Sequence, residues 1–282
     1  MSNSLSSAAI TQFDAEVHHA YQGESLLRGT VRTRTGVVGS THRFPKLGKG
    51  TATQRVTQTD VTPMNVAHTN VSATLTDWNA PEYTDIFDQA KVNFEERTEL
   101  ATTIAGAIGR REDQLILNAL DAASSTLTIS NDIGGTDTGM NTAKARRAKR
   151  LLDDQGGPKA DARTMLVSAQ GLEDMLGTTE ATSTDFNTVK ALVGGEMNTW
   201  LGMNWIMMET RDEGGLVVDG SLDRTTFAYK KSSIGLAVGI ERRTEVNYIP
   251  EKTSWLCNGL FSAGAIAIDA LGVVEMVSRE SA

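Results

Sequence analysis

The sequence predicts an α+β protein in which a mixed sheet is flanked by helices. Three observations predict this class: strand-type alternation with many glycines over residues 29–75, a long helical period over residues 85–123, and strands that alternate with helices after residue 141. Alternation of this last kind is typical of a sheet with helices on its faces. With 282 residues, 39% of them apolar, the chain can form one large domain or two modest ones.

The composition excludes several classes of protein. A formal charge of −8 argues against a protein that coats nucleic acid, because such a protein needs an excess of Lys and Arg. The single cysteine, Cys257, cannot form an intramolecular disulfide, and we expect it to be a buried small hydrophobe. The N-terminus shows no secretory signal. The longest apolar stretch, residues 256–277, contains Asp269 and Glu275, which favours buried sheet over a membrane span.

The N-terminal quarter of the chain is predicted to be an arm followed by a long loop. Residues 1–27 are mostly polar and are expected to be extended. Residues 29–75 show strand-type alternation at 30–33, 56–58 and 71–75, around glycines 36, 39, 48 and 50, which predicts a hairpin-like loop. A two-stranded ribbon is marginally stable alone, so we expect this loop to lie on another surface.

The strongest helical signal covers Asp85 to Ala123. Apolar residues fall seven apart at positions 94, 101, 108 and 115, and acidic residues crowd the first turns, where the helix dipole favours them. A polar, turn-rich hairpin is predicted at residues 125–139. Residues 141–154 are predicted to form a second helix, capped by Asn141 or Thr142 and ended by Gly156, Gly157 and Pro158.

The rest of the chain is predicted to alternate strands with helices and to end in strands. The predicted strands are residues 164–168, 203–209, 225–229, 234–238, 245–249 and 255–277, and the predicted helices are residues 169–177 and 185–200.

The charges are polarised between two neighbouring segments. From Arg28 to Thr59 every charged residue is basic: Arg28, Arg32, Arg34, Arg43, Lys46, Lys49 and Arg55. The segment from Asp60 to Glu99 contains eight carboxylates and only two bases. The carboxylates around the predicted helix start are Asp85, Asp88, Glu95, Glu96 and Glu99. Opposite charges on two segments favour an electrostatic contact, which guides encounter more than it adds affinity.

No constellation for catalysis, cofactor binding or metal binding is found in the sequence. All four histidines lie in the arm or the loop, whereas a catalytic histidine needs a rigid scaffold beside its nucleophile. The GKGT stretch at 48–51 lacks the GK-Ser/Thr order of a phosphate loop. Cys257 has no partner at metal-ligand spacing. We therefore predict no enzyme, no cofactor and no metal site.

The helix at 143–154 leaves two interpretations open. Lys144, Arg147 and either Lys149 or Arg150 form a basic face, which is either a contact for nucleic acid or an acidic neighbour, or a solvated face of an amphipathic helix. No aromatic residue lies among these bases, which argues against stacking on single strands.

The order of the elements resembles that of the major capsid proteins of tailed bacteriophages, which have the Hong Kong 97 fold. The resemblance covers nearly the whole chain and is most telling over residues 163–209, with GLEDML and LVGGEMNTWLGM. It implies an N-terminal arm at 1–27, an extended loop at 28–75, a peripheral domain with its spine helix at 76–160, an axial domain at 161–240, and return strands of the peripheral domain at 241–282.

The resemblance also implies a function. The chain is expected to assemble with copies of itself, as pentamers and hexamers, into an icosahedral shell around double-stranded DNA, which it touches weakly and without sequence specificity. Its other expected partners are a portal, a separate scaffolding protein and a cement protein. No membrane is expected; the protein would be part of the virion and would assemble in the host bacterial cytoplasm. Lys46 and Lys49 lie in the loop, but no partner asparagine is identifiable, so no covalent cross-link is predicted.

This resemblance suggests a binding partner for the basic loop. Since it has little that would form a core, we expect its seven basic residues to contact the acidic segment of another copy of the chain. Two alternatives remain: an encapsulin-like compartment that holds a protein cargo, and a cytosolic α+β enzyme.

Overall fold

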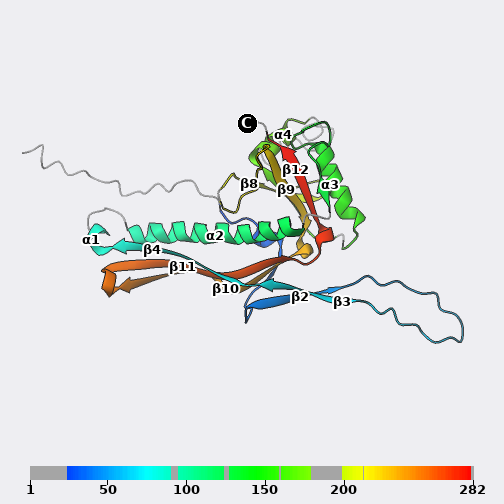
Figure 1. Ribbon diagram of the computed structural model, residues 1–282, viewed down its shortest axis with the longest axis horizontal. Coiled ribbons are helices and arrows are strands. Elements are labelled where there is room, and N and C mark those ends of the chain that lie inside the picture. Colours follow the sequence, from blue (N-terminus) through cyan, green and yellow to red (C-terminus); the bar gives the residue numbers. More distant parts are fainter. Residues whose placement is uncertain are drawn as a thin grey trace, which may run out of the picture.

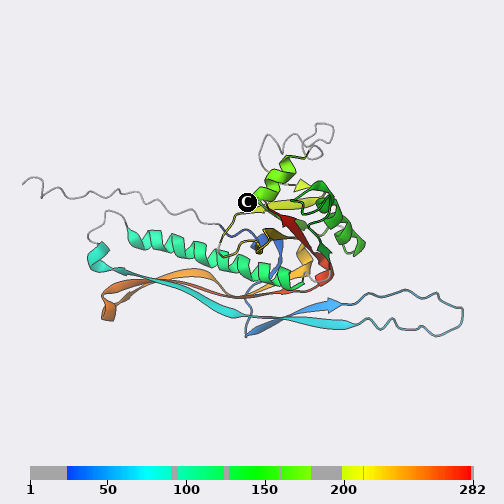
Figure 2. The same ribbon diagram turned by 45° about the horizontal axis from the view of Figure 1, so that its top comes forward.

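The computed structural model describes residues 24–89, 95–123, 127–158, 160–178, 199–211 and 213–280. The molecule is elongated (Figure 1). A long helix lies along a four-stranded sheet, a six-stranded sheet stands at one end of this helix, and a two-stranded ribbon projects beyond it. The view turned by 45° shows the same arrangement (Figure 2).

The four-stranded sheet has the order β1-β10-β11-β4. Its strands are β1 (Arg32–Arg34), β10 (Ile234–Ile249), β11 (Ser254–Ala267) and β4 (Thr76–Asp85). β10 and β11 form a long antiparallel hairpin closed by the 3-10 helix η6 (Pro250–Lys252), β4 pairs antiparallel with β11, and β1 pairs parallel with β10. β1 and β4 are therefore the edges of this sheet.

Helix α2 (Glu96–Ala123) packs on this sheet through its apolar face. Ile104, Ile108 and Leu120 are buried there, and each such side chain contributes roughly 1.5–3 kcal/mol. The helix comes so close to β11 that a Cβ on Gly259 would lie 2.3 Å from Ile108 Cδ1 and 2.5 Å from Ile104 Cγ2. A glycine in the middle of a strand marks this close approach.

The six-stranded sheet has the order β5-β12-β9-β6-β8-β7. Its strands are β5 (Thr128–Ile129), β12 (Val273–Arg279), β9 (Asp223–Lys230), β6 (Arg163–Ser168), β8 (Met203–Met208) and β7 (Thr199–Trp200). Two helices accompany it, α3 (Thr142–Asp154) and α4 (Ala169–Leu176). Each begins at a capping side chain: Asn141 accepts from the N–H of Lys144, and Ser168 accepts from the N–H of Gly171.

One hydrophobic cluster joins the two sheets. It includes Leu120 of α2, Phe227 and Tyr229 of β9, Leu236 of β10 and Phe261 of β11. The chain passes from one sheet to the other through the 3-10 helix η7 (Ala270–Gly272), which separates β11 from β12. A second cluster packs α3 and α4 against the six-stranded sheet, with Met165, Met175 and Trp205 among its members.

The two-stranded ribbon consists of β2 (Thr41–Leu47) and β3 (His68–Thr74). Its base lies on the four-stranded sheet, where Phe44 and Ala73 pack against Ala237 and Ile268. Gly264 allows this contact, because a Cβ there would lie 1.9 Å from the carbonyl oxygen of Thr74. The expectation that the loop lies on another surface is confirmed for its base.

The predicted start of the long helix was wrong. The helix was expected from Asp85, but Thr76–Asp85 form β4, residues 86–89 form the short helix α1 (Ile86–Gln89), and α2 begins at Glu96. β4 pairs with β11 along its whole length, and this tertiary pairing overrides the helical preference at Asp85. Residues 90–94, which include the predicted apolar position 94, lie outside the described residues.

Other elements differ from the prediction in detail. No strand forms at 56–58, since the fully described stretch from Gly48 to Ala67 has neither helix nor strand. The hairpin predicted at 125–139 was wrong: β5 pairs with β12, and the residues after β5 form turns, with the N–H of Thr138 donating to the carbonyl of Asn131. The strands predicted at 234–238 and 245–249 are one strand, β10, whose pairing is interrupted between Val238 and Arg243.

Two predicted elements near the C-terminal half need further comment. The single strand predicted at 255–277 is split into β11 and β12 by η7. Of the helix predicted at 185–200, residues 185–198 lie outside the described residues, and Thr199–Trp200 form β7. The strands predicted at 164–168, 203–209 and 225–229 and the helices predicted at 141–154 and 169–177 are confirmed within one or two residues.

Candidate intersubunit surfaces

Among the described residues, the tip of the loop projects far from the two sheets. Residues 48–67 connect β2 to β3, and the ribbon carries them well beyond the sheets (Figure 1). Val56, Val61 and Met64 are exposed there, Val61 to 87%. Lys49 and Arg55 lie on the same stretch. An exposed segment that combines basic and large apolar side chains has the composition of a contact surface.

The predicted basic residues fall into three places. Arg32 and Arg34 lie on β1, Arg43 and Lys46 lie on β2, and Lys49 and Arg55 lie on the tip. Lys46 has a partner within its own chain, since its Nζ lies 3.0 Å from Asp269 Oδ1. Exposed pairs of this kind contribute little to stability.

Arg28 is also engaged within the chain. Its NH2 group donates to Glu241 at 2.6 Å, and its Nε lies 3.6 Å from the buried carboxylate of Glu112. The basic residues left without an ion pair among the described residues are Arg32, Arg34, Arg43, Lys49 and Arg55.

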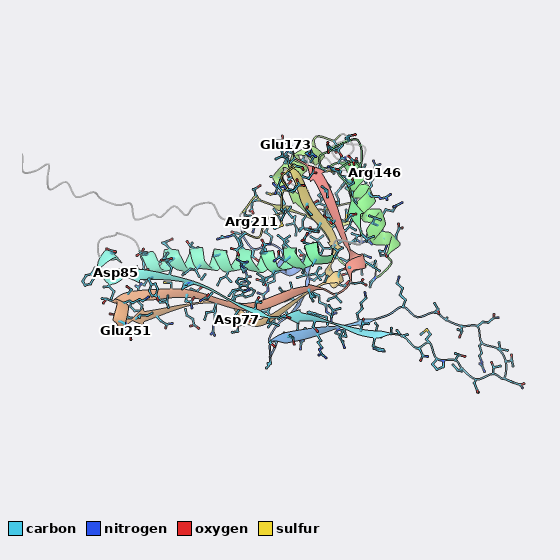
Figure 3. All side chains as sticks on the ribbon, in the orientation of Figure 1. Asp77, Asp85, Arg146, Glu173, Arg211 and Glu251 are labelled. Carbon is cyan, nitrogen blue, oxygen red and sulfur yellow. The ribbon has the colours of Figure 1, made fainter. Side chains whose placement is uncertain are left out.

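The predicted acidic residues lie at the opposite end of the molecule from the loop tip. Asp85 ends β4, Asp88 lies in α1, and Glu95, Glu96 and Glu99 lie at the start of α2. Figure 3 shows Asp85 near Glu251 at this end, whereas Arg146 and Glu173 lie at the six-stranded sheet. The loop tip of one copy therefore points away from its own acidic segment.

Local contacts hold part of the acidic segment. The carboxylate of Asp85 accepts from the N–H of Phe87 at 2.7 Å, and Glu95 pairs with Arg97 at 2.6 Å. Large apolar side chains are exposed nearby: Phe87 to 67%, and Tyr83 and Tyr248 to 42% each. This end thus combines carboxylates with exposed aromatic rings.

A buried ionic cluster lies in the middle of α2, and sequence reasoning missed it. Glu112 and Asp113 are both fully buried. Glu112 pairs with Arg242 of β10 at 3.1 Å and with Arg28 at 3.6 Å. Asp113 accepts from the N–H groups of Leu26 and Leu27 at 3.0 and 3.1 Å, and Arg211 lies 3.5 Å away.

The cluster joins the N-terminal segment, β10 and the stretch after β8 to one helix. Burial raises the pKa of Glu112, although Arg242 and Arg28 act in the opposite direction. Burial also raises the pKa of Asp113, against the two backbone N–H donors. The arm predicted at 1–27 is thus fixed at its end, where Leu27 is buried; residues 1–23 lie outside the described residues.

Lys144 was misplaced by the sequence reasoning. It was assigned to an exposed basic face of α3, but its side chain is fully buried and donates to the carbonyls of Thr138, Gly139 and Val277 at 2.6–3.0 Å. Burial lowers its pKa to about 8. The exposed bases of α3 are Arg146, Arg147 and Arg150.

Cys257 is buried, as expected, and burial raises the pKa of its thiol. Among the described residues, no group of three or more His, Cys, Asp or Glu side chains has an arrangement that would hold a metal ion. No helix in the described part of the chain is long and apolar enough to cross a membrane.

Comparison with known proteins gives a consistent result. A family model described as phage capsid protein matches residues 5–280. No curated protein matches the chain. The capsid of cyanophage P-SCSP1u superposes with a TM-score of 0.78 at 15% identity, over 98% of this chain and 95% of that chain.

Two further solved structures are similar. The head structure of Helicobacter pylori bacteriophage KHP40 gives a TM-score of 0.76 at 11% identity, over 95% of both chains. A structure of Mycobacterium phage Che8 gives 0.71 at 14% identity, over 94% of this chain and 95% of that chain. At these identities the likeness shows the fold, and it confirms the expected capsid fold.

Proposed function

The chain belongs to the family of phage capsid proteins, and we therefore propose that it is the major capsid protein of a tailed phage. Copies of it assemble, as pentamers and hexamers, into an icosahedral shell that encloses double-stranded DNA. The family match gives no support to an encapsulin-like compartment or to a cytosolic enzyme.

One observation carries the proposed mode of assembly: the basic loop tip and the acidic segment lie at opposite ends of one elongated subunit (Figure 1). A contact between two different surfaces of identical subunits is heterologous, and it generates closed rings when the rotation between subunits closes. The loop tip of each copy then docks on the acidic end of the next.

Charge and apolar area act together in this contact. The opposite charges steer encounter and set the register. The exposed Val61 and Met64 of the tip and the exposed Phe87 of the acidic end supply apolar area that association removes from water. Neither surface requires a change in the core of the subunit.

The remaining partners follow from the role in a shell. A portal, a separate scaffolding protein and a cement protein are proposed partners, as is packaged DNA through weak contacts, and the host bacterial cytoplasm is the proposed place of assembly. The negative total charge of the chain suits a wall that does not bind its genome tightly. The five-segment division, from the arm at 1–27 to the return strands at 241–282, remains part of the proposal.

Reversing charge on the loop tests the docking. Arg43→Glu, Lys49→Glu and Arg55→Glu are combined, and Lys46 is kept because it pairs with Asp269 in its own chain. We expect the particle fraction on a sucrose gradient to fall at least about tenfold, because like charges meet at every repeated contact, while circular dichroism shows an unchanged fold. Adding Glu95→Lys, Glu96→Lys and Glu99→Lys should restore part of the assembly.

The control variant changes net charge by the same amount elsewhere. Arg146→Glu, Arg147→Glu and Arg150→Glu on α3 reverse three exposed bases outside the loop. Normal particle yield from the loop variant contradicts the docking, and failure of the rescue contradicts the choice of partner surface. Failure of the unmodified chain to form particles when the proposed scaffolding protein is also present contradicts the shell itself.

A further inference from the structure

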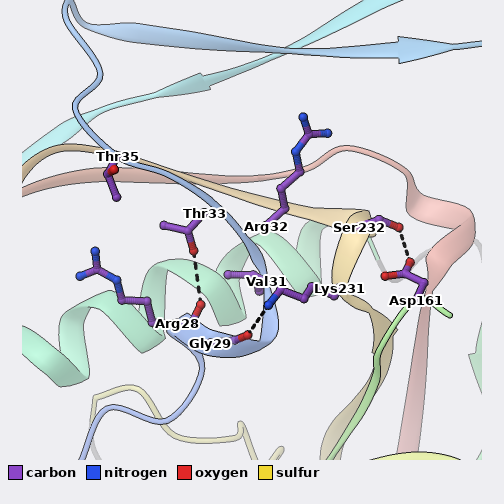
Figure 4. Close-up of a pocket in the computed structure, with 9 residues that line it drawn as sticks. All are labelled: Arg28, Gly29, Val31, Arg32, Thr33, Thr35, Asp161, Lys231 and Ser232. Carbon is purple, nitrogen blue, oxygen red and sulfur yellow. Dashed lines mark hydrogen bonds between the residues drawn. The ribbon is translucent and has the colours of Figure 1, made fainter.

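Strand β10 has a long free edge. β1 pairs with β10 only along residues 235–237. Figure 4 shows this covered end, where Arg32 of β1 and Lys231, just before β10, line the same pocket. Beyond Val238 no described strand lies on this edge, although β10 continues to Ile249. The distal part of β10 is therefore paired on one side alone among the described residues.

The free edge is regular over residues 243–249. The register with β11 is irregular between Val238 and Arg243, and it is then continuous from Arg243, opposite Leu260, to Ile249, opposite Ser254. Pro250 follows and begins the 3-10 helix η6. An edge strand presents a row of main-chain N–H and C=O groups that its own sheet does not pair. Residues 243–249 can therefore form a ladder with another strand.

Exposed side chains lie along this edge. Val246 is 41% and Tyr248 is 42% exposed, and Arg243, Thr244 and Asn247 are exposed as well. A long edge that exposes apolar side chains pairs readily with other chains, and natural proteins cover or interrupt such edges. No proline interrupts residues 243–249. We therefore expect a partner strand to cover this edge in the assembled protein.

The sequence of the edge is complementary to itself. When two copies run antiparallel with Val246 at the centre, the opposing pairs are Thr244 with Tyr248, Glu245 with Asn247, and Arg243 with Ile249. No like charges face each other in this register, and a β-branched residue meets an aromatic ring, which is a favourable cross-strand pair. A register centred on Glu245 would instead place two carboxylates face to face, which is destabilising.

Symmetry favours a second copy as the partner. The proposed docking of the loop tip joins two unlike surfaces and closes rings. A closed shell also needs contacts between rings, and a two-fold contact, in which one patch meets the same patch, is the commonest kind between identical subunits. The edge of β10 is such a patch. β11 separates it from β4, the strand that leads into the acidic end, so both contacts can form on one subunit.

We propose that residues 243–249 of β10 pair antiparallel with the same residues of a second copy, in a two-fold contact centred on Val246. The contact joins the four-stranded sheets of two subunits. It rests on the proposed shell, in which it links one ring to another, and it uses a different surface from the docking of the loop tip.

A charge exchange tests the two-fold contact. In Val246→Lys the new ammonium group faces its own copy across the two-fold axis, and in Val246→Glu a carboxylate does so. With the proposed scaffolding protein present, we expect each variant alone to lower the particle fraction on a sucrose gradient at least about tenfold. Rings should still form, because the loop docking is unchanged. An equal mixture should give at least about threefold more particles than either variant alone, since Lys then meets Glu.

A matched control and the mixture decide the outcome. Val217→Lys changes another exposed valine, outside β10, and should assemble as the unmodified chain does. Normal assembly of both Val246 variants overturns the proposal. A mixture that assembles no better than its parts also overturns it when circular dichroism shows that each variant is folded. If a Val246 charge variant does not fold, the cysteine experiment decides.

Disulfide trapping tests the register. All chains carry Cys257→Ala, because Cys257 lies opposite Val246 on β11 and would compete. Val246→Cys should form a linked dimer with itself on a non-reducing gel, since the two positions meet at the axis. Thr244→Cys and Tyr248→Cys should link to each other in a mixture, and neither should link to itself. Arg147→Cys, on the exposed face of α3, is the control and should form no linked dimer.

The failures of the shell and of the two-fold contact are distinguishable. Particles without a link at Val246 and without a link in the mixture overturn the contact. Absence of particles from the unmodified chain, with the scaffolding protein present, contradicts the shell. Trapping in the concentrated free chain then decides the contact: a linked dimer of Val246→Cys supports it, and no linked dimer overturns it.

Discussion

Arg242 Nε lies 3.1 Å from Glu112 Oε2 and pairs strand β10 with the middle of helix α2, where the carboxylate is fully buried. Arg28, whose Nε lies 3.6 Å from the other oxygen, is the second cation of this cluster. Removal of one partner of a buried pair leaves a desolvated charge behind and typically costs more than the pair contributes. The cluster therefore gives a sharp test of the fold.

We expect Arg242→Met to lower the free energy of unfolding by about 3 kcal/mol, because Glu112 keeps only the longer contact with Arg28. The double variant Arg242→Met with Glu112→Gln should cost clearly less than the sum of the two single changes. Urea unfolding of the four chains measures this coupling. Additive changes in the free energy of unfolding contradict the ion pair. The matched control is Arg243→Met, which changes the exposed neighbour of Arg242.

We expect the contribution of Glu112 to stability to decrease as the pH rises, because burial raises the pKa of its carboxyl group. Burial raises its pKa above the ordinary value of 4.5 in the folded state, so just above pH 4.5 the folded chain retains a proton that the unfolded chain loses. The stability that this group contributes is present below pH 4.5 and is lost as the pH rises through the raised pKa.

The measurement is the difference in unfolding free energy between the unmodified chain and Glu112→Gln. This difference should fall as the pH rises above 4.5, by at most about 1.4 kcal/mol per pH unit, and should level off once both states are ionised. A difference that grows with pH means that Arg242 and Arg28 outweigh burial. Glu251→Gln, at an exposed carboxylate, is the control for the loss of one charge.

Lys144→Met should destabilise the six-stranded sheet. The ammonium group donates to three carbonyls, from the turn before α3 and from β12, and methionine leaves all three without that donor. The carbonyl of Thr138 still accepts from the N–H of Arg279, whereas the carbonyls of Gly139 and Val277 lose the ammonium donor. Each buried unsatisfied group costs about 1–3 kcal/mol, so we expect a loss of at least about 2 kcal/mol in urea unfolding. Arg147→Met on the exposed face of the same helix should change stability by less than about 0.5 kcal/mol. Equal effects of the two changes contradict a structural role for Lys144.

Periodicity and capping residues predicted much of the fold. The strand at 164–168 and the helix at 169–177 are flanked by clear signals, and Ser168 caps that helix as such a sequence favours. The remaining element boundaries depend on pairing between strands that are far apart in the sequence. Nothing local to residues 76–85 shows that β11 pairs with them, and nothing near residues 234–249 shows that one bent strand covers both predicted ones.

The burial of charged residues also depends on contacts that the local sequence does not show. Lys144 follows the pattern of an exposed basic face, and only the fold brings the carbonyl of Val277, from the far end of the chain, to its ammonium group. Glu112 and Asp113 are two acidic residues in a row on a helix, which is ordinary on a surface. A signal was available in Gly109, one turn earlier, since a small residue on a long helix indicates a close neighbour; a Cβ there would lie 3.1 Å from Ser25 Cβ.

The close contact of α2 with β11 predicts that a methyl group at Gly259 lowers stability and that a smaller side chain at Ile108 restores part of it. In Gly259→Ala the new methyl group overlaps Ile108 Cδ1 and Ile104 Cγ2, which lie 2.3 and 2.5 Å from its position. Overpacking of this kind costs about 1–3 kcal/mol, because the helix or the two side chains must shift. Ile108→Val removes the Cδ1 atom and should recover part of the loss when it is combined with Gly259→Ala. Chemical denaturation of the three variants measures the recovery. Gly29→Ala is the control, since no atom lies within 4 Å of its Cβ position. A combined variant less stable than either single variant contradicts this packing of the helix on the strand.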